Sequence, residues 1–194
     1  MRCLLCESYS LSIICLRCQK NFLTPQLLSR TLANGIEVFS FYHYNDIKPL
    51  LFTKHTHIGY SIYSLLAKNS FTPFAKKLPS LPHYISLGID EQVNNGYSHT
   101  AILNHALLSD AITPQHNKLL STNKVSYSGK SKAFRKNNPR NFHISDFKGE
   151  NIILVDDIIT TGSTLCEAIE SLHVRGKNVA FCLTLSDVSL KKSF

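Results

Sequence analysis

The stretch NIILVDDIITTGSTL, residues 151–165, constrains the fold of this chain more than any other part of the sequence. Residues 151–155 form a short apolar run, which predicts a parallel strand buried on both faces. Two acids and a turn of small polar residues follow. Apolar residues then recur at helical spacing as far as Gly176, which is a natural helix stop. This order predicts a strand, a loop and a helix of an α/β fold.

Elsewhere in the chain, apolar runs and helical patterns alternate in the same way. Strand patterns occupy 35–44, 84–89 and 179–185, and helical patterns occupy 47–51, 61–68 and 98–107. Strands that alternate with helices are typical of a mainly parallel sheet flanked by helices. At 194 residues and 43% hydrophobic content, the chain can bury one core and carry a small appendage.

The residues after the predicted strand have the chemistry of a sugar-phosphate site. Asp156 and Asp157 stand at its carboxyl end, the edge where open α/β sheets bind ligands. Their carboxylates can accept hydrogen bonds from sugar hydroxyls. The following turn offers backbone N–H groups and hydroxyls to a phosphate at a helix N-terminus, and consists of Thr160, Thr161, Gly162, Ser163 and Thr164. Aspartate and threonine are also common in caps and turns, so a purely structural role is the alternative.

Four cysteines near the N-terminus form two CxxC pairs, Cys3 with Cys6 and Cys15 with Cys18. Each pair can offer two thiolates to one tetrahedral ion, and zinc is the predicted metal. An iron–sulfur cluster and a disulfide pair are the alternatives. Four cysteine ligands leave no position for a catalytic water, so the zinc would be structural. We expect residues 1–22 to form this zinc module and residues 23–194 to form the main domain.

Charge and hydrophobicity restrict the environment of the chain. No apolar run approaches the roughly 18 residues of a membrane span. The N-terminal stretch is interrupted by cysteines and Glu7 and has no clear small-residue cleavage site, so it does not resemble a signal peptide. We therefore expect a cytoplasmic protein that does not span the membrane, in a compartment where cysteines more often bind metals than form disulfides. The formal net charge of +8 favours acidic partners such as nucleic acid.

Basic residues concentrate between 118 and 140, where no acid occurs. Glycine, proline and several asparagines and serines predict a loop there. Cations mixed with aromatic rings suit single-stranded nucleic acid, because cations follow the phosphates while rings stack on bases. A loop that closes over a diphosphate, or simply a solvated surface, would also account for it. The candidate nucleic-acid contacts are Lys130, Lys132, Phe134, Arg135, Lys136 and Arg140.

The motif at 151–165 resembles the loop of type I phosphoribosyltransferases that binds phosphoribosyl diphosphate. With the N-terminal cysteines, and with Arg135, Asn137 and Phe142 matching a family pattern, the chain resembles the ComF family of competence proteins. That family joins a zinc module to a phosphoribosyltransferase-like domain. At 94–99 this chain reads NNGYSH, where the family usually has an arginine-rich RGFNQ-like stretch.

The resemblance implies roles for particular residues. Asp156 and Asp157 would hold the ribose hydroxyls of phosphoribosyl diphosphate, and residues 160–164 would hold its 5-phosphate. Lys54 lies where the family has a lysine near the diphosphate, and magnesium would accompany that ligand.

The resemblance also implies a function in natural transformation. The protein would bind incoming single-stranded DNA in the cytoplasm or peripherally at the inner membrane, with a DNA-uptake helicase or membrane transport machinery as its partner. An active phosphoribosyltransferase of nucleobase or nucleotide metabolism and a non-catalytic sensor of phosphoribosyl diphosphate are the alternatives.

Overall fold

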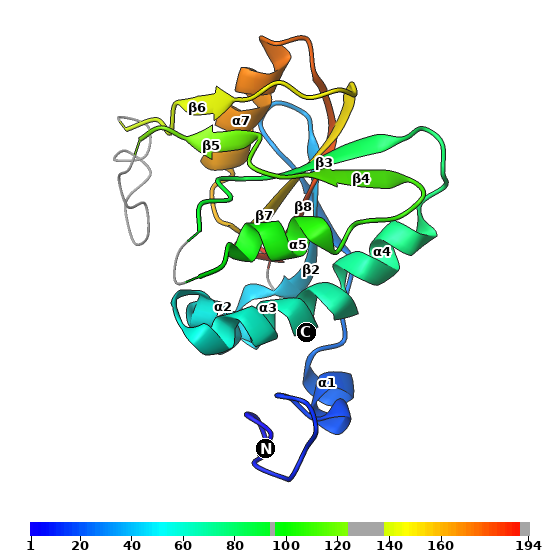
Figure 1. The fold of residues 1–194 in the computed structure, drawn as a ribbon, viewed down its shortest axis with the longest axis vertical. Coiled ribbons are helices and arrows are strands. Elements are labelled where there is room, and N and C mark those ends of the chain that lie inside the picture. Colours follow the sequence, from blue (N-terminus) through cyan, green and yellow to red (C-terminus); the bar gives the residue numbers. More distant parts are fainter. Residues whose placement is uncertain (94–95, 124–137, 191–194) are drawn as a thin grey trace.

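A computed structural model describes residues 1–93, 96–123 and 138–190. Its centre is a six-stranded sheet with the order β1-β2-β8-β7-β3-β4 (Figure 1). β1 and β2 are antiparallel, and all other neighbours are parallel. The strands are β1 (Leu28–Thr31), β2 (Glu37–His43), β3 (Tyr84–Gly88), β4 (Ile112–Gln115), β7 (Asn151–Ile159) and β8 (Asn178–Asp187). The predicted mainly parallel α/β fold is confirmed.

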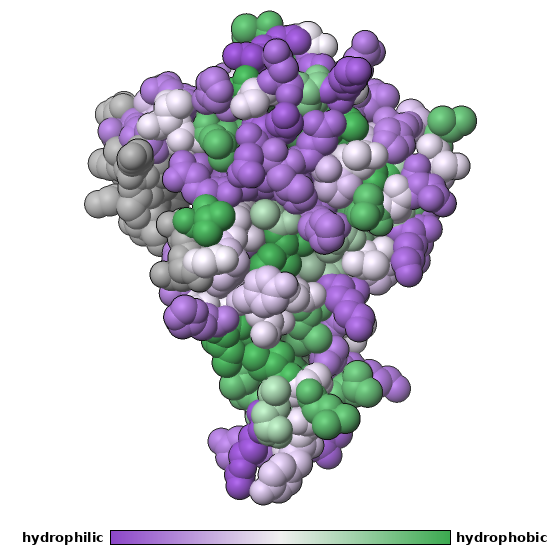
Figure 2. Space-filling model, viewed as in Figure 1, coloured by the Kyte–Doolittle hydropathy of each residue, from purple (hydrophilic) through white to green (hydrophobic). Residues whose placement is uncertain are grey.

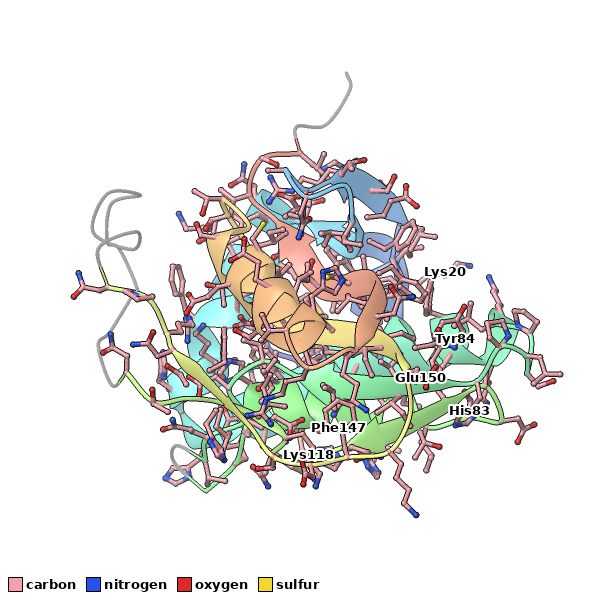
Figure 3. All side chains as sticks on the ribbon, turned by 90° about the horizontal axis from the view of Figure 1, so that it is seen from above. Lys20, His83, Tyr84, Lys118, Phe147 and Glu150 are labelled. Carbon is pink, nitrogen blue, oxygen red and sulfur yellow. The ribbon has the colours of Figure 1, made fainter. Side chains whose placement is uncertain are left out.

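Helices cover both faces of this sheet (Figure 1). One face carries α2 (Tyr44–Leu51), the 3₁₀ turn η1 (Phe52–His55), α3 (His57–Asn69), α4 (Phe71–Lys77) and α5 (His99–His105). The other face carries α7 (Ser163–His173), which lies across the sheet when the molecule is seen from above (Figure 3). β7 serves both faces, because Ile153 and Val155 join the first core while Ile152 and Leu154 join the second. Burial on both sides explains the apolar run that the sequence shows here.

The sequence missed the two edge strands. β1 pairs with one neighbour only, and its side chains are alternately half-buried and exposed, so it lacks an apolar run. β4 contains Pro114, a residue that argues against a central strand and is tolerated at an edge. The prediction that the central strand ends at Val155 was also wrong. β7 continues to Ile159, because it stays paired with β8 as far as Asp187.

A two-stranded antiparallel ribbon, β5 (Leu119–Ser121) and β6 (Phe142–Ile144), lies beside the main sheet. Lys118 precedes it, and its Nζ donates to Asp146 O at 2.8 Å. Figure 3 shows Lys118 next to Phe147 on this side of the molecule. The ribbon therefore holds together the two ends of the basic segment.

The N-terminal segment contributes α1 (Leu16–Phe22) and lies at one end of the molecule (Figure 1). Cys3, Ile14 and Cys18 belong to the same core cluster as α3 and α4. Gln19 Oε1 also accepts a hydrogen bond from Asn69 Nδ2 of α3 at 3.1 Å. Among the helices of the described residues, none is long and apolar enough to cross a membrane.

Candidate functional site

A pocket of about 370 Å³ opens at the carboxyl ends of β7 and β8, and we call it the β7 pocket. Its walls come from the α2–η1 corner, from the end of β7 and from the first turn of α7. The lining includes eight residues that the sequence singled out: Lys54, Asp156, Asp157, Thr160, Thr161, Gly162, Ser163 and Thr164. The structure therefore brings together all the residues proposed for phosphoribosyl diphosphate, although they come from two distant parts of the chain.

Asp157 is 5% exposed and lies among donors from three other elements. Its Oδ2 lies 2.9 Å from Lys54 Nζ, 3.2 Å from the Tyr63 hydroxyl and 3.5 Å from His99 Nε2. Burial alone would raise the pKa of Asp157, but Lys54 and then His99 outweigh it and hold the pKa below its usual range. Asp157 is thus an ionised carboxylate fixed on the α3–α5 side of the sheet.

The pKa of Asp156 is shifted in the opposite direction from that of Asp157. Burial, together with the adjacent charge of Asp157, raises the pKa of Asp156 to about 7. Its Oδ1 accepts a hydrogen bond from the Asp157 backbone N–H at 2.8 Å. Two neighbouring acids therefore differ in protonation near neutral pH, which is common where carboxylates handle a ligand.

Residues 160–164 form a turn into α7 that suits an anion. Gly162 is the N-cap residue in a left-handed conformation with φ +80°, and no side chain caps the helix. The first amide groups of α7 thus point out of the helix end without an intrahelical acceptor. The hydroxyls of Thr161 and Ser163 hydrogen bond to each other beside them. Amides, hydroxyls and the helix dipole together form an environment that favours a phosphate.

Arg30 supports this turn from the edge of the sheet, a role that sequence analysis missed. Its Nε lies 2.8 Å from Asp187 Oδ2, and its second guanidinium nitrogen donates to Thr160 O at 2.8 Å. Asp187 is fully buried at the end of β8. An acid directly after an apolar strand is the feature that drew attention to Asp156, so Asp187 could have been found in the same way. Arg30, Tyr63 and His99 lie in no comparable sequence pattern, so the sequence alone could not have identified them.

The candidate nucleic-acid residues fall into two groups. Arg140 is described, and it lines the β7 pocket. Its guanidinium lies 3.2 Å from Asp90 Oδ2, on the segment that follows β3. The other candidates lie outside the described residues: Lys130, Lys132, Phe134, Arg135 and Lys136. The basic segment therefore ends at the sugar-phosphate candidate site.

The four N-terminal cysteines converge on one point. Their sulfur atoms all lie within 4.8 Å of one another, and Cys6 Sγ and Cys15 Sγ are 3.7 Å apart. Four thiolates around a tetrahedral zinc ion, with Zn–S bonds of about 2.3 Å, would be about 3.8 Å apart, so this arrangement fits zinc. The backbone N–H of Cys15 lowers the pKa of the Cys3 thiol more than burial raises it. A lowered pKa at Cys3 favours the thiolate that a metal requires, whereas burial raises the pKa of the Cys18 thiol to about 12.

Comparison with known families agrees with this geometry. Residues 106–192 match the family model described as "Phosphoribosyl transferase domain". The match covers less than half of the chain, and it includes β7, the turn at 160–164 and α7. This part of the chain is phosphoribosyltransferase-like. No curated protein matches the sequence.

Solved structures with similarity to this one include several phosphoribosyltransferases. Orotate phosphoribosyltransferase from Aeropyrum pernix is 17% identical, with a TM-score of 0.41, over 88% of this chain and 80% of that chain. Adenine phosphoribosyl transferase from Trypanosoma brucei is 14% identical, with a TM-score of 0.43, over 87% and 78%. A hypoxanthine phosphoribosyltransferase from Staphylococcus aureus is 14% identical, with a TM-score of 0.38, over 68% of each chain.

Proposed function

We propose that the β7 pocket binds phosphoribosyl diphosphate. The observation that carries this proposal is the convergence of two carboxylates, a lysine and an uncapped helix N-terminus around one pocket. The turn at 160–164 would hold the 5-phosphate through amides and hydroxyls. Asp156 and Asp157 would accept hydrogen bonds from the ribose hydroxyls, and the ammonium of Lys54 would meet the diphosphate.

The bound ligand would require a rearrangement of one ion pair. Lys54 Nζ contacts Asp157 Oδ2 at 2.9 Å, so it must share or leave this carboxylate to reach a diphosphate. Carboxylate oxygens of the kind that Asp156 and Asp157 offer suit magnesium, which would neutralise part of the diphosphate charge when it is bound. A ligand with more negative charge than the carboxylate would draw the lysine toward it.

Isothermal titration calorimetry with phosphoribosyl diphosphate and magnesium tests this proposal. Asp156→Asn keeps the shape of the side chain and removes its charge, and we expect affinity to fall about 10- to 100-fold, since charge-assisted hydrogen bonds are worth about 1.5–3 kcal/mol. Asp110→Asn is the matched control, because Asp110 is exposed and lies outside the pocket. Equal affinity for wild type and Asp156→Asn would show that Asp156 does not contribute to binding of phosphoribosyl diphosphate.

We further infer a role in DNA uptake, in which the basic segment binds single-stranded DNA. The net charge of +8 and the resemblance to the ComF family support this inference. The protein would act in the cytoplasm or peripherally at the inner membrane, beside a DNA-uptake helicase or membrane transport machinery. The zinc site would then be structural and would fix the N-terminal segment on α3 and α4.

Salt dependence tests the DNA inference. For a single strand, the log–log slope of affinity against salt is about −0.7 per neutralised phosphate. Replacement of four basic residues by alanine should make this slope shallower by about two to three units, as measured by fluorescence anisotropy on a labelled strand. The four are Lys130, Lys132, Arg135 and Lys136. Phe134→Ala should instead lower affinity at all salt concentrations with little change in slope, because stacking releases no counterions.

The position of Arg140 in the β7 pocket favours a second candidate function. If the basic segment closes over the diphosphate, the protein is an active phosphoribosyltransferase or a sensor of this metabolite. The quadruple variant would then keep its DNA affinity and lose affinity for phosphoribosyl diphosphate. Diphosphate release in the presence of a nucleobase would identify a transferase. Sensing would appear as reciprocal coupling when both ligands are titrated together.

A further inference from the structure

Tyr97, Ser98 and His99 belong to the stretch at 94–99 that differs from the ComF pattern, and the proposed function gives them no role. They lead from the segment after β3 into α5, which packs against α3. In the view of Figure 2, pale and green residues interrupt the purple surface in the region of α5 and α3. The ring of Tyr97 lines a hollow between these two helices, and only 9% of this residue is exposed. A tyrosine so deeply buried needs a partner for its hydroxyl.

The Tyr97 hydroxyl is directed at the backbone of the turn that carries Lys54. It lies 2.8 Å from the carbonyl oxygen of Lys54, 3.1 Å from that of Thr56 and 3.4 Å from that of Thr53. A phenol has one hydrogen to donate, so the three carbonyls share it. The shortest of the three contacts is with the residue whose ammonium pairs with Asp157 in the β7 pocket. One hydroxyl therefore holds together the main chain of η1.

η1 depends on such contacts for its position. None of its four residues, all of them described, has a buried side chain. A 3₁₀ turn also has poorer internal hydrogen bonds than an α-helix. The Tyr63 hydroxyl reaches the carbonyl oxygen of Leu51 at 3.3 Å, directly before η1, and Tyr97 reaches η1 itself. The place of Lys54 in the pocket is thus set by hydrogen bonds to main-chain atoms.

Gly59 of α3 allows Tyr97 and η1 to approach each other this closely. A Cβ at Gly59 would overlap both the Tyr97 hydroxyl and the carbonyl oxygen of Thr53. The backbone N–H of Gly59 donates to Thr56 O at 3.0 Å, which ties the end of the turn to the start of α3. The absence of a side chain here therefore makes room for the contact between the tyrosine and the turn.

The same segment contacts the other partner of the Lys54 ion pair. His99 Nε2 lies 3.5 Å from Asp157 Oδ2, the oxygen that Lys54 Nζ contacts at 2.9 Å. Ser98 fixes the start of α5, because its Oγ accepts a hydrogen bond from the Ala101 backbone N–H at 3.2 Å. Residues at one helix start therefore contact both the main chain of the lysine and the side chain of the aspartate.

We propose that Tyr97 is a positioning residue of the β7 pocket and sets its preference for a sugar diphosphate over a sugar monophosphate. The inference rests on the proposed function, in which the ammonium of Lys54 meets the diphosphate. Tyr97 is not among the described residues that line the β7 pocket, so it acts through Lys54. Without its hydroxyl, η1 is held less firmly, and binding of the diphosphate must also order the turn, which lowers affinity.

Isothermal titration calorimetry tests the inference on the full-length, zinc-loaded protein with magnesium. It compares phosphoribosyl diphosphate with ribose 5-phosphate, which lacks the diphosphate. Tyr97→Phe keeps the ring and removes the hydroxyl. We expect its affinity for phosphoribosyl diphosphate to fall about three- to tenfold, as for one lost hydrogen bond, and its affinity for ribose 5-phosphate to change less than about twofold.

Tyr60→Phe is the matched control. Tyr60 lies on α3, is 56% exposed, and packs its ring edge to face on that of Tyr97, with centroids 6.0 Å apart. Loss of its hydroxyl leaves this ring contact in place, so both affinities should equal those of the wild type.

A double-mutant cycle separates positioning from a general effect on stability. If Tyr97 acts through Lys54, Tyr97→Phe should have no further effect on phosphoribosyl diphosphate binding in the Lys54→Met protein. A residue that only stabilises the fold would lower the affinity for both ligands and would do so in either background.

The inference is overturned if the wild type and Tyr97→Phe bind phosphoribosyl diphosphate equally well. It is also overturned if affinity for ribose 5-phosphate falls in parallel, or if the effect of Tyr97→Phe persists undiminished in Lys54→Met. These results would leave the proposed function intact. A wild type that binds neither ligand would instead overturn the proposed function, and this inference with it.

Discussion

Asp156 and Asp157 are adjacent in the chain, yet we expect their replacement by asparagine to change the free energy of unfolding in opposite directions. Asp157 is a buried, ionised partner of Lys54 and receives further contacts from Tyr63 and His99. Asp156 has a raised pKa, so its ionised form is disfavoured in the folded protein. Asp157→Asn should therefore destabilise the protein at pH 8, and Asp156→Asn should stabilise it.

The change in the free energy of unfolding expected for Asp157→Asn follows from the Lys54 charge, which loses its ion-pair partner. Removing one partner of a buried ion pair typically costs about 3–5 kcal/mol. The Lys54 side chain is 25% exposed and can turn toward solvent, which reduces this cost. The new amide oxygen can still accept from Tyr63. We expect a loss of about 2–3 kcal/mol.

The magnitude for Asp156→Asn follows from the pKa shift. A change from 3.8 to about 7 would correspond to about 4 kcal/mol if it were expressed in full. Asp156 is only half-buried, so solvent screens part of this cost. We expect a gain of about 1–2 kcal/mol at pH 8.

The direction of each pKa shift determines how the contributions of Asp156 and Asp157 to stability change with pH. Because the folded pKa of Asp156 is raised, the folded state holds an extra proton between about pH 4 and 7. Wild-type stability falls as pH rises through this window, and the gain from Asp156→Asn vanishes below about pH 4. The folded pKa of Asp157 is lowered. Its contribution is present above about pH 4 and is lost as pH falls below that value.

Urea unfolding at pH 8 and pH 4.5, followed by circular dichroism, measures these changes. Asp110→Asn, on an exposed acid, is the control and should change stability by less than about 0.5 kcal/mol. The double variant with Lys54→Met and Asp157→Asn also removes the lysine charge that Asp157→Asn leaves without its partner. The double variant should be less destabilised than the sum of the single variants by about 1–2 kcal/mol. Changes of the same sign for both asparagine variants, or strict additivity with Lys54→Met, would refute the reasoning.

Three other outcomes are expected. Protein purified under reducing conditions should contain about one zinc per chain by elemental analysis, and Cys3→Ser or Cys15→Ser should lose the metal and lower the melting temperature. Gly162→Ala should destabilise the protein by about 1–2 kcal/mol in urea and weaken phosphoribosyl diphosphate binding, because φ is +80° and the new Cβ would lie 2.6 Å from Leu32. Calorimetric affinity for phosphoribosyl diphosphate should rise as pH increases through about 7, because ionised Asp156 accepts more strongly from ribose hydroxyls than the protonated acid does. A flat profile between pH 6 and 8 would contradict this.

The sequence by itself determined the features that depend on local pattern. The apolar run of β7, the turn at 160–164 and the start of α7 are contiguous, so their residue types could be interpreted directly. The two CxxC pairs are similarly local, and their sulfur atoms meet as the spacing predicts. These features predicted a mainly parallel α/β fold, a turn suited to a phosphate and a metal site.

Tertiary structure alone decided which distant groups meet at the site. Lys54 is 103 residues from its partner Asp157, and Tyr63 is 94 residues from it. No periodicity connects such positions, because they are brought together by the crossing of helices over a sheet. Strand pairing likewise extends β7 beyond Val155, because its hydrogen-bonding partner β8 continues to Asp187.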